Sequence, residues 1–291
     1  MKLQQFALIT LAISLNVSAA KFAPDVIYGE DNRIDTFQST SALHKKLALG
    51  TAAQIVNANL KVRGSTVELV AEPLSSMPGP QNPPLCAKER FHDQPTASRC
   101  SGFLVADNIL VTAGHCMQTA SDCSSASWVF NYKVNSSSQT AVSVAAKDVF
   151  KCKRIIKQAL LPGSATDFAV IELDRPNTGK ALKLAKTVPT LGTPIFMIGH
   201  PSGLPQKITT NAKVIRVSGN SFRTDLDAFG GNSGSSVFNT AGEIVGILVN
   251  GDTDYRINSA LNCVEANQMA SARNGEGVSA ISQFTAFLPK K

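Results

Sequence analysis

From Cys100 onward, short apolar runs alternate with clusters of turn-forming residues. Residues 103–111 form two such runs that meet at Ala106-Asp107-Asn108, which predicts a hairpin. Further strands are predicted at residues 128–134, 168–173, 195–198, 213–217, 235–238 and 243–249. Evenly spaced short strands with few stretches of helical period indicate an all-β barrel or sandwich.

The pattern is weaker between residues 21 and 85. Ser39-Thr40-Ser41 can cap a short helix that ends before Gly50, and residues 67–70 alternate like a strand. Six proline and glycine residues between positions 73 and 84 then exclude regular structure. Two interpretations remain for this segment: a propeptide, or the first strands of the mature domain followed by an exposed loop.

The first twenty residues are typical of a secretory signal peptide. Lys2 precedes an apolar stretch at residues 6–15, and small residues follow at 17–20. The apolar stretch is too short to span a bilayer, and no later segment is as apolar, so no membrane insertion is expected. We predict a signal peptide at residues 1–20 and an exported protein, either extracellular or periplasmic.

Composition narrows the class of protein further. A chain of 291 residues can form one large domain or two small ones, and 43% hydrophobic residues suffice for a core. The net charge of +7 comes from lysines and arginines that are scattered along the chain, with no long basic run or aromatic platform. We therefore expect no nucleic-acid partner.

The six cysteines are an even set in a chain expected to be exported, which favours disulfides over free thiols. Sequence alone allows fifteen pairings of six cysteines. No pair of histidines or cysteines has the spacing of a zinc site. The expectation is three disulfides, no metal and no cofactor.

Three short motifs contain residues suited to acyl transfer: Thr112-Ala113-Gly114-His115-Cys116, Asp167-Phe168-Ala169-Val170-Ile171 and Gly230-Gly231-Asn232-Ser233-Gly234-Ser235. A serine becomes a nucleophile when a base removes its proton and a third group orients that base. Each motif alone has a structural alternative, namely a packed histidine, a strand-capping aspartate or a glycine-rich turn. Their order, His then Asp then Ser, and Ser235 in place of a glycine argue against an α/β-hydrolase elbow.

These motifs resemble those of chymotrypsin-like serine peptidases, and more closely those of the bacterial glutamyl-endopeptidase-like branch. There, Gly-Asn-Ser-Gly-Ser replaces the Gly-Asp-Ser-Gly-Gly of the animal enzymes. The resemblance covers residues 86–291, and residues 26–33 resemble the mature N-terminus of that branch, which favours mature strands in the 21–85 segment. It implies two six-stranded antiparallel β-barrels in a peptidase domain at 86–291, to which we add a short C-terminal helix near residues 282–287.

The resemblance also implies the role of each site residue. Ser233 is the nucleophile, His115 the general base and then the general acid, and Asp167 the group that orients the imidazole. Glu172 and Asp174 are the neighbouring carboxylates that could replace Asp167. The backbone amides of Gly231 and Ser233 would form the oxyanion hole.

Substrate preference is expected from residues around Ser233. Asp227 lies six positions earlier, where trypsin-like enzymes carry the carboxylate that binds Lys or Arg. The alternative is an aspartate in a turn or at the surface. Leu248 and Ala228 stand where glutamyl-specific relatives carry a histidine and a hydroxyl residue, which argues against glutamate specificity. Residues 249–251, which end at Gly251, would pair with the substrate backbone.

Two further expectations follow from the resemblance. Asn232 has no charge with which to bind a newly cut N-terminus, so activity should not require the trypsin-type ion pair. The family disulfide beside the catalytic histidine implies a Cys100–Cys116 pair. The pairing of the other four cysteines stays open: Cys123 and Cys152 flank the segment 128–149, and a bond between them would leave Cys86 for Cys263.

The leading prediction is a secreted, monomeric serine endopeptidase that acts on proteins or peptides, with a possible Lys/Arg preference. The alternative is a catalytically idle peptidase fold that binds peptides, or an extracellular interaction protein.

Overall fold

The computed structural model describes residues 26–79, 81–161, 166–251, 253–270, 272 and 274–289. The predicted signal peptide at residues 1–20 lies outside these residues. Within them, no helix is both long enough and apolar enough to cross a membrane.

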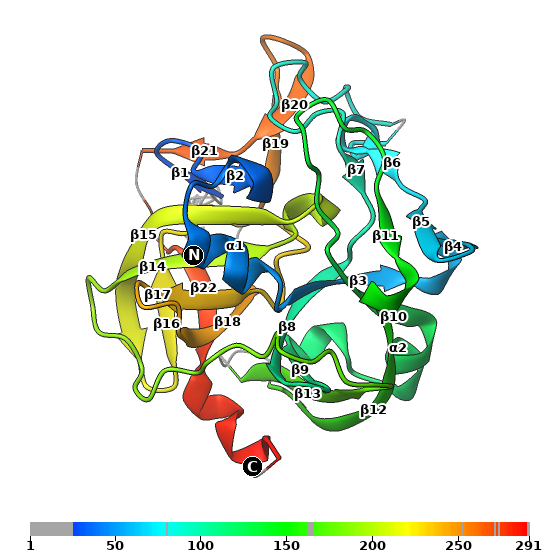
Figure 1. Ribbon diagram of the computed structural model, residues 1–291. Helices are drawn as coiled ribbons and strands as arrows, with labels where there is room; N and C mark the ends of the chain where they lie inside the picture. Colours follow the sequence, from blue (N-terminus) through cyan, green and yellow to red (C-terminus); the bar gives the residue numbers. More distant parts are fainter. Residues whose placement is uncertain are drawn as a thin grey trace, which may run out of the picture.

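Six antiparallel strands close a first barrel in the order β10-β12-β13-β9-β8-β3 (Figure 1). Their bounds are β3 Thr51–Val56, β8 Cys100–Ala106, β9 Ile109–Thr112, β10 Ala126–Phe130, β12 Val149–Leu160 and β13 Asp167–Leu173. The residues of β3, β8 and β9 are mostly buried, as expected for strands that line a closed barrel.

A second ring has the order β14-β17-β18-β22-β16-β15 and is closed by pairing between β14 and β15. Its strands are β14 Pro194–Gly199, β15 Lys207–Ser218, β16 Ser221–Thr224, β17 Ser236–Asn239, β18 Ile244–Asn250 and β22 Glu276–Ala280. A seventh strand, β2 (Arg33–Asp35), is added on β15. The predicted architecture of two six-stranded antiparallel barrels is confirmed.

Shorter elements lie around the barrels. The strands are β1 Ile27–Tyr28, β4 Leu60–Arg63, β5 Thr66–Leu69, β6 Glu72–Pro73, β7 Pro95–Thr96, β11 Ser143–Ala145, β19 Tyr255–Asn258, β20 Cys263–Ala266 and β21 Gln268–Met269. The helices are α1 Ala42–Ala48 and α2 Ala120–Ser125. The 3₁₀ turns are η1 Thr36–Gln38, η2 Asn57–Asn59, η3 Leu74–Ser76, η4 Gly114–Cys116, η5 Ala146–Asp148, η6 Pro201–Gly203, η7 Ile281–Gln283 and η8 Thr285–Phe287.

The segment before Cys86 contributes to both barrels. β3 completes the first barrel and β2 extends the second, while β1 pairs in parallel with β21. The expected helix is present as α1, in which Ser41 Oγ accepts a hydrogen bond from the His44 amide. The choice between mature strands and a propeptide, and the boundary at residue 85, stay predictions.

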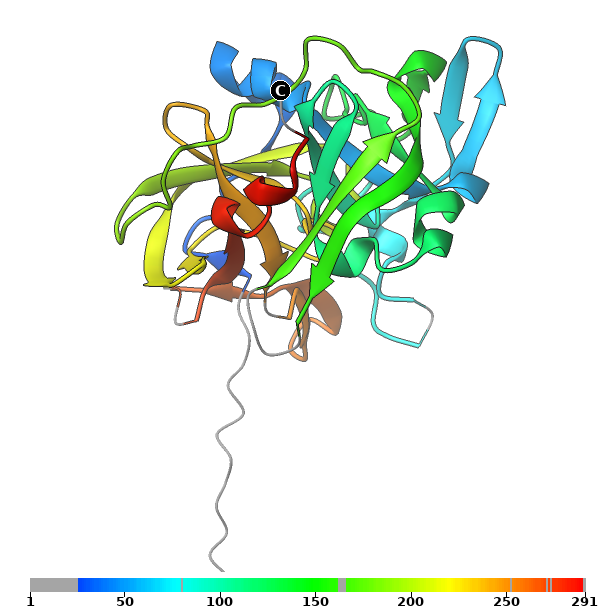
Figure 2. The ribbon, with the colours of Figure 1, turned by 90° about the horizontal axis from the view of Figure 1, so that it is seen from below.

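The C-terminal segment differs from the expected helix. It consists of two single 3₁₀ turns, η7 and η8, which meet at Phe284. The ring of Phe284 is fully buried and contacts Phe103 and Phe168 of the first barrel. Because the backbone breaks at Phe284 (φ −120°), no continuous helix forms. In Figure 2 this segment lies between the two barrels.

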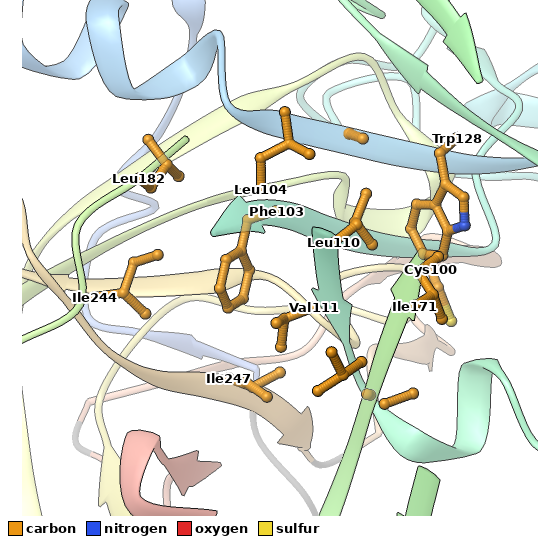
Figure 3. Close-up of a cluster of buried hydrophobic side chains, with 14 of the residues drawn as sticks. Cys100, Phe103, Leu104, Leu110, Val111, Trp128, Ile171, Leu182, Ile244 and Ile247 are labelled. Atoms are coloured by element: carbon orange, nitrogen blue, oxygen red, sulfur yellow. The ribbon is translucent and has the colours of Figure 1, made fainter. Parts of the chain in front are cut away.

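One hydrophobic cluster joins the two barrels. Figure 3 shows Phe103 and Val111 of the first barrel close to Ile244 and Ile247 of the second, with Leu182 from the connection between them. All of these side chains except Leu182 are fully buried. This shared core therefore fixes how the two barrels pack against each other.

A buried ion pair ties the N-terminal segment to the second barrel. Lys207 Nζ is completely buried and donates to Asp35 Oδ1 (2.6 Å), Gln94 Oε1 (2.7 Å) and the Pro205 carbonyl (2.8 Å). Burial lowers the pKa of Lys207 to about 8, against the opposing effect of Asp35. With three acceptors around the ammonium group, its hydrogen-bonding capacity is filled, which a buried charge requires.

Three disulfides are present: Cys86–Cys263, Cys100–Cys116 and Cys123–Cys152. The Cys100–Cys116 pair is the one that the resemblance implied, and the other two settle the pairing that the sequence left open. The second joins the start of β8 to η4, which carries His115.

Candidate active site

Asp167 holds both the backbone and the ring of His115. His115 follows β9 on the turn η4, and Asp167 is the first residue of β13. The His115 amide donates to Asp167 Oδ1 (3.0 Å), and Nδ1 lies 2.7 Å from Oδ2. Because a carboxylate only accepts, Nδ1 donates the proton of this hydrogen bond. Asp167 therefore fixes the orientation of the imidazole.

The two alternative carboxylates point to other partners. Glu172 accepts from Lys153 and Arg154, each at 2.7 Å. Asp174 pairs with Arg175. Only Asp167 of the three is hydrogen-bonded to His115.

Two glycines shape the loop that contains Ser233. Gly231 has φ +90° and Gly234 has φ +89°, values that side chains rarely adopt. A Cβ at Gly231 would lie 2.5 Å from the His200 carbonyl oxygen, and one at Gly234 would overlap the Ser101 carbonyl oxygen. Both positions require glycine for conformation and for space.

Ser101 of β8 holds this loop from the first barrel. Its amide donates to the Ser233 carbonyl (2.8 Å), and its hydroxyl donates to the Gly231 carbonyl (2.8 Å) while accepting from the His200 amide (3.1 Å). The Ser233 carbonyl also lies 3.8 Å from Cys116 Sγ, directly after His115. The structure thus places Ser233 beside the His115 turn. Sequence reasoning missed Ser101, because nothing in its local pattern marks it.

The amide of Gly231 points away from the neighbouring Ser202. The Gly230 carbonyl accepts from the Ser202 amide (2.5 Å). In a trans peptide the N–H points opposite to the C=O, so the Gly231 N–H points away from Ser202. Among the described residues, neither the Gly231 nor the Ser233 amide donates to a protein acceptor. Both donors remain available to a ligand.

Asn232 stays within its own loop. Its side chain is fully buried, and Oδ1 accepts from Ser235 Oγ (3.3 Å). Its amide donates to the Phe229 carbonyl (2.9 Å). The expectation that activation needs no N-terminal ion pair stays a prediction.

A pocket of about 510 Å³ opens beside Ser233. It is lined by Phe229, Gly230, Ser233, Leu248, Asn250, Gly251, Thr253, Asp254, Tyr255 and Glu276. Two of the expected substrate-binding residues, Leu248 and Gly251, are therefore next to the expected nucleophile.

Asp227, the third expected substrate-binding residue, does not line this pocket. Its side chain is buried and accepts from the amides of Tyr28 (2.9 Å) and Asn32 (2.7 Å). Burial raises the pKa of Asp227 to about 6, against the opposing effect of these amides. The inward orientation was one of the two alternatives, but the space that Asp227 faces is filled by residues 26–33. This carboxylate anchors the N-terminal segment.

Two other carboxylates line the pocket, and sequence reasoning missed both. Asp254 Oδ2 accepts from the Gly230 amide (2.8 Å), and burial raises the pKa of Asp254 to about 6. Glu276 begins β22 and accepts from the Tyr28 hydroxyl (2.9 Å). A Cβ at Gly251 would overlap the Glu276 carboxylate, so Gly251 leaves room for it. The pocket is therefore acidic.

A metal does not fit the one candidate cluster among the described residues. Cys100, His115 and Cys116 bring possible ligand atoms within 4.8 Å of one another. Both cysteines form a disulfide and so offer no thiolate.

Comparisons with known proteins agree with this geometry. The family model of the trypsin-like peptidase domain matches residues 100–247. The chain belongs to this family, and it is a chymotrypsin-like serine peptidase, as the motifs indicated. No curated protein matches the chain.

Two solved structures are similar to the chain. A Glu endopeptidase in complex with MPD is 18% identical, with a TM-score of 0.49, over 90% of this chain and 97% of that one. The Rv3671c protease from M. tuberculosis, in its active form, is 12% identical, with a TM-score of 0.48, over 99% of this chain and 93% of that one.

We predict that His200 makes the protein less stable in acid. Burial lowers the pKa of His200 to about 3 from 6.5. Its ring stacks on Tyr132, and Nδ1 donates to the Leu204 carbonyl (3.1 Å). Between these pH values the unfolded state binds a proton that the folded state does not, so the free energy of unfolding falls as pH decreases from about 6.5 towards about 3.

Denaturant unfolding at a series of pH values measures this effect. Asp227 and Asp254 act in the opposite direction, because their raised pKa values favour the folded state on acidification. Comparison with His200→Phe and His200→Gln therefore isolates the histidine: both variants should lose less stability on acidification than the wild type. Equal losses would contradict this role.

Proposed function

We propose that this protein is a secreted serine endopeptidase that cleaves peptide bonds through an acyl-enzyme on Ser233. The observation that carries the proposal is the double hydrogen bond from His115 to Asp167, next to the loop of Ser233. Because the chain belongs to a peptidase family, its substrates are proteins or peptides.

Each step of acyl transfer has a residue suited to it. His115 Nε2 removes the Ser233 proton as Oγ attacks the carbonyl carbon, and the Gly231 and Ser233 amides donate to the developing oxyanion. Asp167 stabilises the imidazolium that forms. His115 then protonates the leaving amine, and a water activated by the same nitrogen hydrolyses the ester.

A preference for Lys or Arg before the cleaved bond is supported by Asp254 and Glu276 rather than by Asp227. Both carboxylates line the pocket that contains Ser233, where a substrate ammonium or guanidinium group would find negative charge. Tyr28 positions Glu276, so the N-terminal segment contributes to this preference.

Export and a monomeric state complete the proposal. Three disulfides in a chain of this length suit an oxidising compartment, such as the periplasm or the extracellular medium. No observation favours the idle peptide-binding alternative, and the test below separates the two.

We expect Asp167→Asn to lower kcat for peptide hydrolysis by about 10⁴-fold, since an amide at this position favours the wrong imidazole tautomer. Asp174→Asn is the matched control, because Asp174 follows the opposite end of β13 and pairs with Arg175 instead of His115. It should keep wild-type activity. Steady-state kinetics on a fluorogenic peptide measure both.

Ser233→Ala should likewise abolish turnover and labelling by a sulfonyl fluoride. A folded wild-type protein that neither cleaves peptides nor becomes labelled would instead support the idle alternative.

We also expect Asp254→Asn and Glu276→Gln to reduce the preference for Lys and Arg. Each substitution removes one negative charge from the pocket while retaining its size, and the pair together should lower kcat/KM for Arg peptides by at least about tenfold. Cleavage profiling on a peptide library gives the preference directly. Asp93→Asn, at an exposed carboxylate, is the control.

Enrichment of Glu or of apolar residues at the cleaved bond in the wild type would contradict a basic preference without affecting the proposed chemistry.

A further inference from the structure

A second, larger pocket of about 860 Å³ adjoins the pocket of Ser233. Asn250 and Gly251, at the end of β18, line both. The second pocket is otherwise lined by Thr166, Arg216, Ser218, Asn220, Ser221, Phe222, Arg223, Val249, Asn274, Gly277, Val278 and Gln283. We call it the arginine pocket.

Two arginines give this pocket its charge. Arg216 of β15 and Arg223 of β16 are directly opposite each other in the register of the hairpin, and Arg223 is also opposite Gly277 of β22. Their side chains therefore lie on the same face of the sheet. No carboxylate is among the described residues that line the pocket.

Like charges directly opposite each other destabilise a strand pair. Arg223 Nη1 donates to Asn250 Oδ1 (2.9 Å) and to the Gly275 carbonyl (3.2 Å), both uncharged. Arg216 is exposed and makes no ion pair within the described part of the chain. No carboxylate of the described residues forms an ion pair with either arginine, so an anion would bind favourably to both.

We propose that the arginine pocket binds an acidic side chain of the substrate, about two to four residues before the cleaved bond. The proposal rests on the proposed peptidase function, because the pocket is continuous with that of Ser233 through Asn250 and Gly251. When the residue directly before the cleaved bond enters the pocket of Ser233, the preceding residues of an extended peptide would lie along this part of β18. Carboxylates of Asp or Glu then meet Arg216 and Arg223.

The polar residues around the arginines support the same ligand. Ser218, Asn220, Ser221 and Asn274 supply uncharged hydrogen-bonding groups. Such groups can solvate a carboxylate without competing for its charge. A preferred substrate would therefore carry Lys or Arg directly before the cleaved bond, for the acidic pocket of Ser233. It would carry Asp or Glu two to four residues before that bond, for the arginine pocket.

The test compares peptides that differ only by Glu or Gln at the second to fourth residues before the cleaved bond. Wild-type kcat/KM should be about threefold to tenfold higher for the Glu peptides. Arg216→Gln should remove most of this preference, and Arg216→Glu should reverse it. Arg216 makes no hydrogen bond or ion pair in the described part of the chain, so these variants should fold.

Lys213→Gln is the matched control, since Lys213 is an exposed cation on the same strand that does not line the pocket. It should keep the preference for Glu. Raising the salt from about 0.05 M to about 0.5 M should weaken the wild-type preference by screening the charges.

Binding separates failure of this proposal from failure of the peptidase function. Fluorescence anisotropy of the same labelled peptides on Ser233→Ala protein needs no hydrolysis. Tighter binding of Glu peptides that is lost in Ser233→Ala/Arg216→Gln supports the arginine pocket even if no peptide is cleaved. Equal kcat/KM and equal affinity for Glu and Gln peptides would overturn it.

Discussion

The site depends on close backbone packing between the two barrels at the Ser233 loop. Gly234 approaches Ser101 of the first barrel, and Gly231 approaches His200 of its own barrel, so closely that no side chain fits at either position. Ser101, on the first barrel, holds the carbonyls of Gly231 and Ser233. Since Asp167 fixes His115 on that same barrel, both halves of the proposed catalytic machinery share one rigid support. The shared hydrophobic core keeps that support in place.

The N-terminal segment is a second structural constraint on the site. Asp227 anchors it through two backbone amides, and Tyr28 then reaches Glu276 in the pocket. Lys207 and Asp35 bind the following strand to the second barrel. Substrate selection would thus depend on residues that are far from Ser233 in the sequence. The neighbouring arginine pocket would add contacts to substrate residues that precede the cleaved bond.

The strand pattern was enough to predict an all-β barrel or sandwich, because strand alternation is local. The two six-stranded barrels and the groups proposed for acyl transfer came from the resemblance that the three motifs carry. Asp227 shows the limit of such reasoning. It lies at the sequence position, six residues before Ser233, where trypsin-like enzymes carry the pocket carboxylate. In the structure, residues about 200 positions earlier in the chain fill the space that it faces. Asp254, Glu276 and Ser101 could not be found, since their roles arise only from long-range contacts. The short C-terminal helix is present only as two 3₁₀ turns, because the backbone at Phe284 departs from helical geometry.

The central claim is acyl transfer through Ser233, and pre-steady-state kinetics with an activated ester test it most directly. The account predicts a burst of released alcohol equal to the enzyme concentration, with the acyl group located on Ser233 by peptide mapping in the acid-quenched protein. A burst that persists in Ser233→Ala, or an acyl group on another residue, would contradict it.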